Sequence, residues 1–454
     1  MLLNCHTYYS FGYGTLSVEA LLDTVRQHGY DAFALTDINN TSACIETLRM
    51  APEKGLKAVA GIDFRNGIRQ QYVALARNPD GYRELNEHLS RFLHSGEELP
   101  PIAPAFEQAY VIYPMQAYQG WPLRENEFIG IAVQDLASAS FTAAARYPSR
   151  WVALQPFTFT DQIHFNTHRL LRAIDTNTLL SKLPVSEQGD IRHSIRHRSW
   201  MEQQYAAYPA LLHHTQRLLQ DCQMTFEYGK LSNKNLKYYT RSYEEDTDLL
   251  RSLCMNGLPY RYPQAGPEVM NRIEKELEVI TQLRFASYFL INWDITRYAR
   301  HKNYYYVGRG SGANSILAYL LRITDVNPIE LDLYFERFIN LYRNNAPDFD
   351  IDFCQHGRDR VIQYVKDKYG KEAVSQIATF GTMAARAAIR DVGRVLEQGY
   401  NFVDGIAKLV PNKPGQYMTI DMAKKEEKQL AEREKNEDEV RQLLSLAEQL
   451  EGMT

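Results

Sequence analysis

The sequence lacks a long apolar run and has few cysteines. Its first residues, Met1 to His6, carry neither a basic cluster nor a long apolar stretch, so we expect a cytoplasmic protein without an export signal or membrane span. The five cysteines are scattered and odd in number, which argues against a disulfide framework and against a CxxC metal knuckle. With 44% hydrophobic and 23% charged residues, the composition is typical of a globular protein.

An excess of positive charge is also missing. The chain has 51 Lys and Arg against 55 Asp and Glu, a formal net charge of −4. Because such a chain has no global attraction to nucleic acid, any contact with DNA must come from local basic patches. Its 454 residues are too many for one ordinary hydrophobic core, so two to three domains are expected.

The strongest local pattern is acidic. Between Pro347 and Cys354, the carboxylates of Asp348, Asp350 and Asp352 alternate with apolar residues, which predicts a strand with all three on one face. Such charges repel one another and need water or cations above them. Carboxylates suit Mg²⁺ or Mn²⁺, and two such ions about 4 Å apart can clamp both oxygens of a phosphoryl displacement. A solvated acidic edge strand is the alternative.

Two further patterns flank the acidic segment. A glycine-rich stretch at 308–315 precedes an apolar helical run at 316–321, an arrangement that can cradle phosphate but matches neither the P-loop nor the dinucleotide fingerprint. Downstream, residues 382–398 predict a helix whose arginines form one stripe, although such a stripe is usually a solvated face. These arginines are Arg386, Arg390 and Arg394. The three features together could hold a nucleoside triphosphate with its metals.

In this order and spacing, the motifs closely resemble the palm of C-family replicative DNA polymerases. The similarity also includes Ile-Thr-Asp, Phe-Glu-Arg-Phe and Phe-Gly-Thr-Met-Ala-Ala segments at 323–325, 335–338 and 380–385. The resemblance implies an α/β multidomain protein with a polymerase-beta-like nucleotidyltransferase palm, a mixed sheet flanked by helices. Its activity would be the addition of dNTPs to a primer 3′-hydroxyl by two-metal chemistry.

The resemblance also implies roles for individual residues. Asp350 and Asp352 would be the catalytic pair that holds two Mg²⁺ ions, while Gly310, Ser311 and Arg390 would contact the dNTP phosphates. The residues expected to support these motifs are Asp348, Arg309, Arg386 and Arg394.

The first 230 residues show a different pattern, in which short β-rich runs alternate with helical stretches such as Ser17 to His28. This alternation predicts a parallel α/β barrel or open sheet, with any chemistry at the carboxyl ends of the strands. The region resembles the PHP domain of the same polymerases, a distorted α/β barrel that in active members holds a metal cluster for phosphoester hydrolysis.

Most ligand positions implied by this resemblance carry other residues. Asn4 stands in the first place of the family's His-x-His pair, and Ile38 and Gln71 replace further histidines. We therefore predict a structural PHP domain without catalytic metals. A residual phosphoesterase or 3′–5′ exonuclease is the alternative. The candidates that remain from the degenerate site are His6, Asp37, Asp63 and, near the last strand, Asp175.

We predict a PHP-like domain at 1–230, a palm at 231–400 with a polar connector at 230–243, and a mostly helical thumb at 401–454. Because the family continues with a third catalytic aspartate and the fingers, we expect this chain to be the N-terminal part of a longer polymerase and inactive alone. The resemblance implies primer-template DNA, dNTPs, a sliding clamp, other replisome subunits and a proofreading exonuclease subunit on the PHP domain as partners, and no membrane. A non-catalytic nucleic-acid-binding module is a further alternative.

Overall fold

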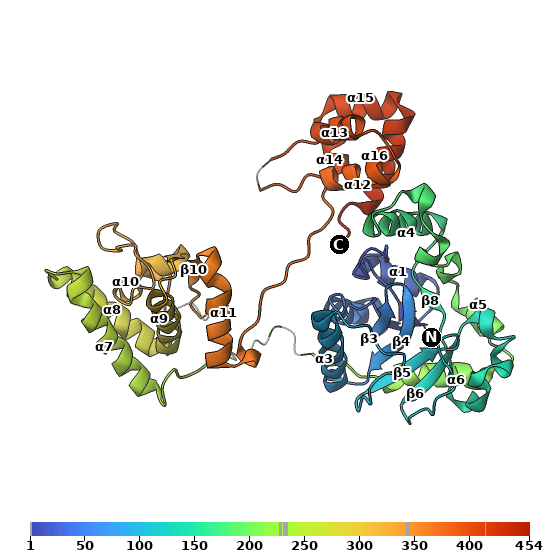
Figure 1. The fold of residues 1–454 in the computed structure, drawn as a ribbon, viewed down its shortest axis with the longest axis horizontal. Helices are drawn as coiled ribbons and strands as arrows, with labels where there is room; N and C mark the ends of the chain where they lie inside the picture. Colours follow the sequence, from blue (N-terminus) through green and yellow to red (C-terminus); the bar gives the residue numbers. More distant parts are fainter. Residues whose placement is uncertain (1, 227–228, 230–234, 342–345, 414) are drawn as a thin grey trace. The chain divides into compact units, whose positions relative to one another are not determined.

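The computed structural model describes residues 2–226, 229, 235–341, 346–413 and 415–454. The chain forms two compact units, Met1–Tyr228 with Thr379–Thr454, and Gly229–Ala378 (Figure 1). Each unit is described by itself. The predicted connector at 230–243 lies partly outside the described residues, since 230–234 are among the gaps.

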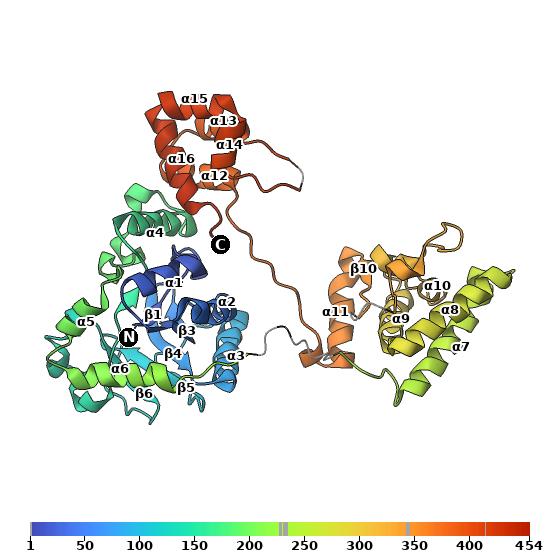
Figure 2. The same ribbon diagram turned by 180° about the vertical axis from the view of Figure 1, so that it is seen from behind.

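The described part of the first unit contains a curled eight-stranded sheet, which agrees with the predicted distorted α/β barrel (Figures 1 and 2). The order is β7-β6-β5-β4-β3-β2-β1-β8, and every neighbouring pair is parallel except the two that involve β4. β4 is reversed because a two-residue turn with Gly67 at φ 58° joins it to β3 as a hairpin. The strands are β1 Leu2–Cys5, β2 Ala32–Leu35, β3 Lys57–Asn66, β4 Arg69–Ala76, β5 Ala109–Pro114, β6 Glu127–Ile131, β7 Trp151–Ala153 and β8 Pro156–Phe157.

Both faces of this sheet are buried, as in parallel α/β folds. On β4, Tyr72, Ala74 and Ala76 belong to one apolar cluster, and the alternating Val73 and Leu75 belong to another. The covering helices are α1 Val18–Gln27, α2 Cys44–Met50, α3 Pro79–Ser95, α4 Gln162–Asp175, α5 Arg198–Gln204 and α6 Pro209–Asp221. The predicted N-cap of α1 is confirmed, because the Ser17 side chain accepts a hydrogen bond from the Ala20 amide.

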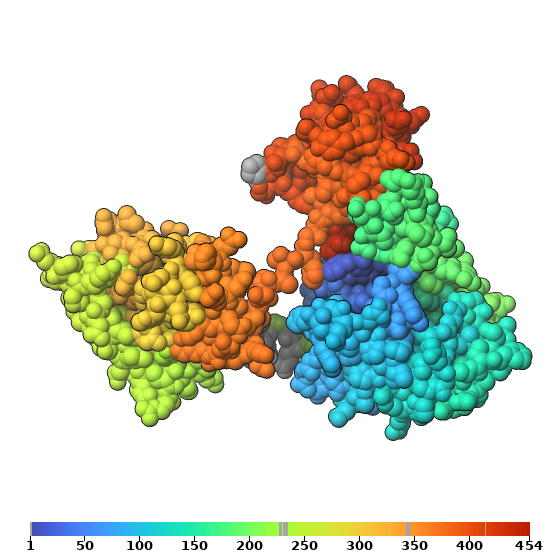
Figure 3. All heavy atoms as spheres, in the orientation of Figure 1, coloured from blue at the N-terminus to red at the C-terminus, as the bar shows by residue number. Residues whose placement is uncertain are grey.

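Five helices of the C-terminal segment complete the first unit. They are α12 Ala385–Val395, α13 Tyr400–Leu409, α14 Ile420–Glu426, α15 Lys428–Asn436 and α16 Asp438–Leu450. Ile389 and Val392 of α12 share one apolar cluster with Leu170 and Leu171 of α4, and Figure 3 shows the green and the orange-red atoms in contact. The predicted palm range 231–400 therefore includes a helix that packs with the N-terminal unit, and these domain boundaries stay a prediction.

The second unit is built on a two-stranded antiparallel sheet, β9 Tyr306–Arg309 and β10 Asp350–Phe353. Its helices are α7 Tyr243–Arg261, α8 Pro267–Leu283, α9 Ala286–His301, α10 Ile316–Leu320 and α11 Gln355–Tyr369. Ile273, Leu277 and Ile280 of α8 are buried, and they pack in one cluster with residues of α9 and α10. In the described ranges, no helix combines the length and the apolar character needed to cross a bilayer.

Candidate active site

The acidic segment forms β10, and its predicted alternation is present. Asp350 and Asp352 are exposed, whereas Ile351 and Phe353 are partly buried. The sequence pattern predicts that Asp348 lies in the same strand. Asp348 is exposed too, but in the structure it lies before the strand. The strand begins at Asp350 because its partner β9 ends opposite, at Arg309.

Arg309 lies between the two strand carboxylates. Its Nε donates to Oδ2 of Asp352 at 2.9 Å and its Nη1 donates to Oδ2 of Asp350 at 3.3 Å. The hydrogen bond to Asp352 and the charges of both carboxylates raise the pKa of Arg309 above its usual value. Both aspartates are about half exposed, at 49% and 63%. A positively charged guanidinium thus occupies the space between these carboxylates.

The glycine-rich loop contacts the same acidic face. Gly310 has φ 71°, a backbone conformation that L side chains rarely adopt. A Cβ atom at this position would lie 2.5 Å from Oδ2 of Asp350, so a larger residue would also have to displace that carboxylate. Ser311 follows in the same single turn, in which its carbonyl accepts a hydrogen bond from the side chain of Asn314 at 2.9 Å. The structure thus brings Gly310 and Asp350 together.

The amino end of the helix after this loop is already occupied by a carboxylate, and a phosphate cradle at Gly310 and Ser311 stays a prediction. The Glu276 carboxylate accepts hydrogen bonds from the Ile316 amide at 3.0 Å, the Leu317 amide at 3.3 Å and the Ser315 hydroxyl at 2.7 Å. It is fully buried and pairs with Arg272 at 2.7 Å. A carboxylate that satisfies these donors leaves them unable to bind a phosphate. Sequence reasoning missed Glu276, although its i, i+4 spacing from Arg272 was a visible signal.

The predicted arginine stripe is present on α12, in the first unit. Arg390 binds Asp404 at 2.9 and 3.2 Å, and Arg386 donates to the carbonyl of Val410 at 3.0 Å. Arg394 donates to the side chain of Asn177 at 2.8 Å. Each of the three guanidiniums therefore has a partner within its own unit, and contact of Arg390 with dNTP phosphates stays a prediction.

In the PHP-like sheet, a buried ion pair lies among the degenerate ligand positions. Arg65 donates to Oδ2 of Asp63 from Nη2 at 2.6 Å and from Nε at 3.0 Å, and the same oxygen lies 3.1 Å from Nε2 of His6. Burial by itself would raise the pKa of Asp63, but the Arg65 charge and the His6 hydrogen bond lower it well below its ordinary range. Burial lowers the pKa of His6. The sequence analysis overlooked Arg65, although its spacing of two from Asp63 places both on one face of β3.

The other candidates near this pair bind neighbouring protein groups. Asp37 accepts from the Thr7 amide at 2.6 Å and from the hydroxyls of Thr7 and Ser10 at 2.7 Å each, and burial raises its pKa to about 7. Asp175 is half exposed and pairs with Arg172 at 2.6 Å. Within the described ranges, no three metal-ligating side chains converge on one point.

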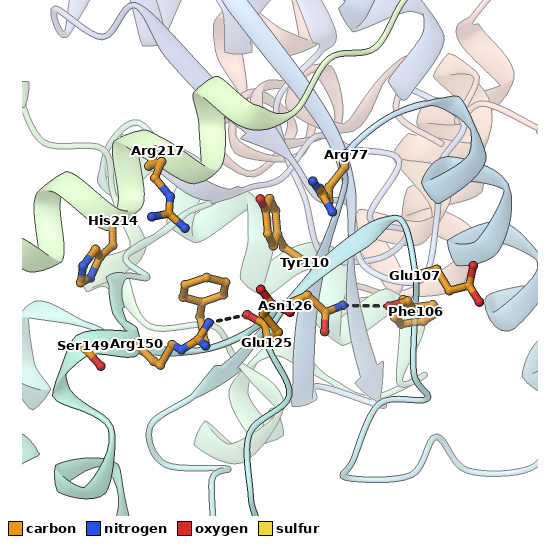
Figure 4. Close-up of a pocket in the computed structure, with 11 residues that line it drawn as sticks. Arg77, Phe106, Glu107, Tyr110, Glu125, Asn126, Ser149, Arg150, His214 and Arg217 are labelled. Carbon is orange, nitrogen blue, oxygen red and sulfur yellow. Dashed lines mark hydrogen bonds between the residues drawn. The ribbon is translucent and has the colours of Figure 1, made fainter.

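The first unit also has a cavity of about 630 Å³ (Figure 4). It lies at the amino ends of β5, β6 and β7, where Arg77, Arg150 and Arg217 surround the ring of Tyr110. His6 and Asp37 instead follow the carboxyl ends of β1 and β2, which run in the same direction. The cavity and the degenerate metal site are therefore at opposite ends of the sheet.

Two family models match the chain. Residues 3–120 match the PHP domain, and residues 248–454 match the bacterial DNA polymerase III alpha NTPase domain. A PHP domain and a polymerase domain therefore follow each other in one chain, as the resemblance implied.

Curated relatives agree over nearly the whole chain. DNA polymerase III subunit alpha of Pseudomonas aeruginosa is 32% identical over 505 residues, which cover 100% of this chain and 42% of that protein. The Bacillus subtilis and Escherichia coli K12 proteins of the same name are each 31% identical, covering 99% and 100% of this chain and 43% of each relative. The chain belongs to the family of DNA polymerase III alpha subunits, and it spans less than half the length of these relatives.

Proposed function

We propose that this chain supplies the PHP domain and the metal-binding palm strand of a replicative DNA-directed DNA polymerase. The single observation that carries the proposal is the pair Asp350 and Asp352, both half exposed on one face of β10, with the Arg309 guanidinium between them. Carboxylate oxygens of this kind are the ligands that Mg²⁺ prefers. The position of Arg309 supports the fit, because a positive charge is already accommodated there.

In the proposed reaction, Asp350 and Asp352 would hold two Mg²⁺ ions. Bound there, the ions would lower the pKa of the primer 3′-hydroxyl and neutralise charge on the triphosphate. Gly310 and Ser311 would approach the dNTP phosphates closely, since glycine leaves the acidic face open beside Asp350. Arg390 would supply a fixed positive charge to those phosphates, which requires it to exchange its partner Asp404.

The proposed substrates are primer-template DNA and dNTPs, and the proposed setting is the cytoplasm. The sliding clamp, other replisome subunits and a proofreading exonuclease subunit on the PHP domain are proposed partners of the complete polymerase. The alternative, a PHP-type phosphoesterase, is disfavoured because Arg65 binds the carboxylate of Asp63 that such an enzyme needs for metal.

The test is primer extension by the complete polymerase that carries this chain, with all four dNTPs and Mg²⁺. Asp350→Asn and Asp352→Asn should each reduce the rate by about 100-fold or more, because misplaced reacting atoms alone cost that much. Asp359→Asn is the matched control, since Asp359 is 85% exposed and lies outside the acidic face on α11. Rates within twofold of wild type in either of the first two variants would refute the assignment.

A further inference from the structure

The second unit has a cavity of about 530 Å³ whose lining includes neither Asp350 nor Asp352 and is strongly basic. It lies at the carboxyl end of α9, in the loop that leads to β9 and beside Arg322. We call it the basic pocket. Its lining includes three arginines, one histidine and two tyrosines, and it contains no carboxylate. The basic residues are Arg297, Arg300, His301 and Arg322.

Asp294, which pairs with one of the lining arginines, does not neutralise this charge. Arg297 donates to Oδ1 of Asp294 at 3.0 Å, but Asp294 is completely buried and also pairs with Lys368 at 2.6 Å. Asp294 further accepts hydrogen bonds from the hydroxyls of Tyr364 and Tyr369 at 2.9 and 3.0 Å. One carboxylate is thus shared by two cations, which leaves the region with a net positive charge.

Arg322 offers a guanidinium that is available to a ligand. Its backbone is left-handed, with φ 60°, and Nη1 of Arg300 donates to its carbonyl at 3.0 Å. The guanidinium carbon lies 4.7 Å from the ring centroid of Tyr260. Across the described ranges, no hydrogen bond or ion pair involves this guanidinium. Stacking on one face leaves the N–H groups at its edge able to bind phosphate oxygens.

Tyr305 provides an aromatic ring beside these cations. Its side chain is 85% exposed, whereas the neighbouring Tyr304 packs closely against Gly357 of α11. The backbone of Tyr305 is fixed, because its carbonyl accepts a hydrogen bond from the Cys354 amide at 2.9 Å. A ring that contributes nothing to the core but projects from a fixed backbone is suited to stacking on a planar ligand.

The basic pocket and the acidic face lie at the two ends of β9, which runs from Tyr306 to Arg309. Such a strand spans about 10 Å. That length corresponds to about three nucleotides of one strand at 3.4 Å each. A strand of nucleic acid could therefore reach from one to the other along the ribbon.

We propose that the basic pocket binds single-stranded DNA, with Arg322 and its cationic neighbours on phosphates and Tyr305 stacked on a base. A single strand is favoured over a duplex because stacking on a side chain requires an unpaired base face. If the chain is part of a polymerase, as proposed above, the single strand bound here is the unpaired template. Only this identification as template rests on the proposed function, and the binding of single-stranded DNA does not.

The test is the affinity of the 454-residue chain for a fluorescent oligothymidylate, measured by anisotropy without Mg²⁺ or dNTP over a range of salt. Tyr305→Ala should weaken binding about tenfold, and Tyr305→Phe should retain it because the ring remains. Arg322→Asn, which tolerates the left-handed backbone, should weaken binding and lower the slope of log affinity against log salt by about 0.7. Arg241→Asn is the control, because Arg241 is 90% exposed on the same unit outside the pocket.

The inference is overturned if Tyr305→Ala and Arg322→Asn both bind within twofold of wild type. A second combined result also overturns it: polyglutamate competes as well as the unlabelled oligonucleotide, and Tyr305→Ala changes the affinity for neither polymer. The surface would then bind acidic polymers through charge alone. Asp350→Asn should leave this binding intact. Failure of the proposed function, seen as primer extension by Asp350→Asn, is therefore a separate result.

Discussion

Replacing Arg65 by Met should strongly destabilise the PHP-like unit. Arg65 is 5% exposed and Asp63 is completely buried, and their closest atoms are 2.6 Å apart. The substitution retains much of the packing of the side-chain stem, including its position near the Tyr13 ring, but leaves the Asp63 charge without its main counter-charge. Two unit charges about 4 Å apart interact by about 4 kcal/mol at an effective dielectric constant of about 20. Breaking a buried pair on one side typically costs about 3–5 kcal/mol.

Differential scanning calorimetry measures this loss as a fall in Tm. For a unit of this size, about 3–5 kcal/mol corresponds to a decrease of about 5–8 °C. Arg83→Met is the control, because Arg83 and its partner Asp80 are both 67% exposed, so that variant should change stability by less than about 0.5 kcal/mol. The double variant Asp63→Asn with Arg65→Met leaves no unpaired buried charge and should recover part of the loss. A Tm within 2 °C of wild type for Arg65→Met, or a double variant less stable than Arg65→Met alone, would refute the reasoning.

Three other expectations concern the metal content of the chain and two buried carboxylates, those of Asp37 and Glu276. Metal analysis of the purified chain should find well under one Zn²⁺ or Mn²⁺ per molecule, and stoichiometric metal that is lost in His6→Ala would contradict this. The raised pKa of Asp37, about 7 in the folded state, means that its contribution to stability is present below pH 3.8 and is lost as pH rises towards 7. Unfolding midpoints of Asp37→Asn should therefore depend less on pH than those of wild type between about pH 4 and 7.5. The same slope of midpoint against pH in both proteins would contradict this expectation. Glu276→Ala should cost the second unit about 3–5 kcal/mol in urea unfolding, because Arg272 and the amides of α10 lose a buried partner, whereas the exposed Glu274→Ala should cost under about 1 kcal/mol.

The elements with a strong local period could be predicted from the sequence. The alternation around Asp350 and Asp352 predicts a strand with exposed carboxylates, because side chains on a strand alternate between faces with a period of two. The arginine stripe and the apolar face of α12 follow in the same way from a period of 3.6 residues. The reversal of β4 also had a local signal, the Asn66-Gly67 turn, which the alternation of strands and helices obscured.

The remaining features depend on partners that are distant in sequence. Glu276 meets the amino end of α10 about forty residues away, and an apolar helix face such as that of α12 does not reveal that α4 will cover it. A buried carboxylate also gives no sign in the sequence of whether it binds a metal or a guanidinium. Asp63 is the exception among these features, because its partner Arg65 lies only two residues away on the same face of β3.

If Asp350 and Asp352 bind metal as proposed, the ion pairs of Arg309 have a consequence for how that metal would bind. The Arg309 guanidinium acts as a counter-ion for Asp350 and Asp352, so a divalent cation would compete with it. Because the guanidinium is attached to the chain, its local concentration is fixed, and its ion pairs weaken as the salt concentration rises. A displaced guanidinium remains within reach of the same face, because its backbone is held in β9 opposite Asp350. There the guanidinium would be able to pair with a triphosphate instead. Metal and nucleotide would then be linked ligands, each raising the apparent affinity of the other by the same factor.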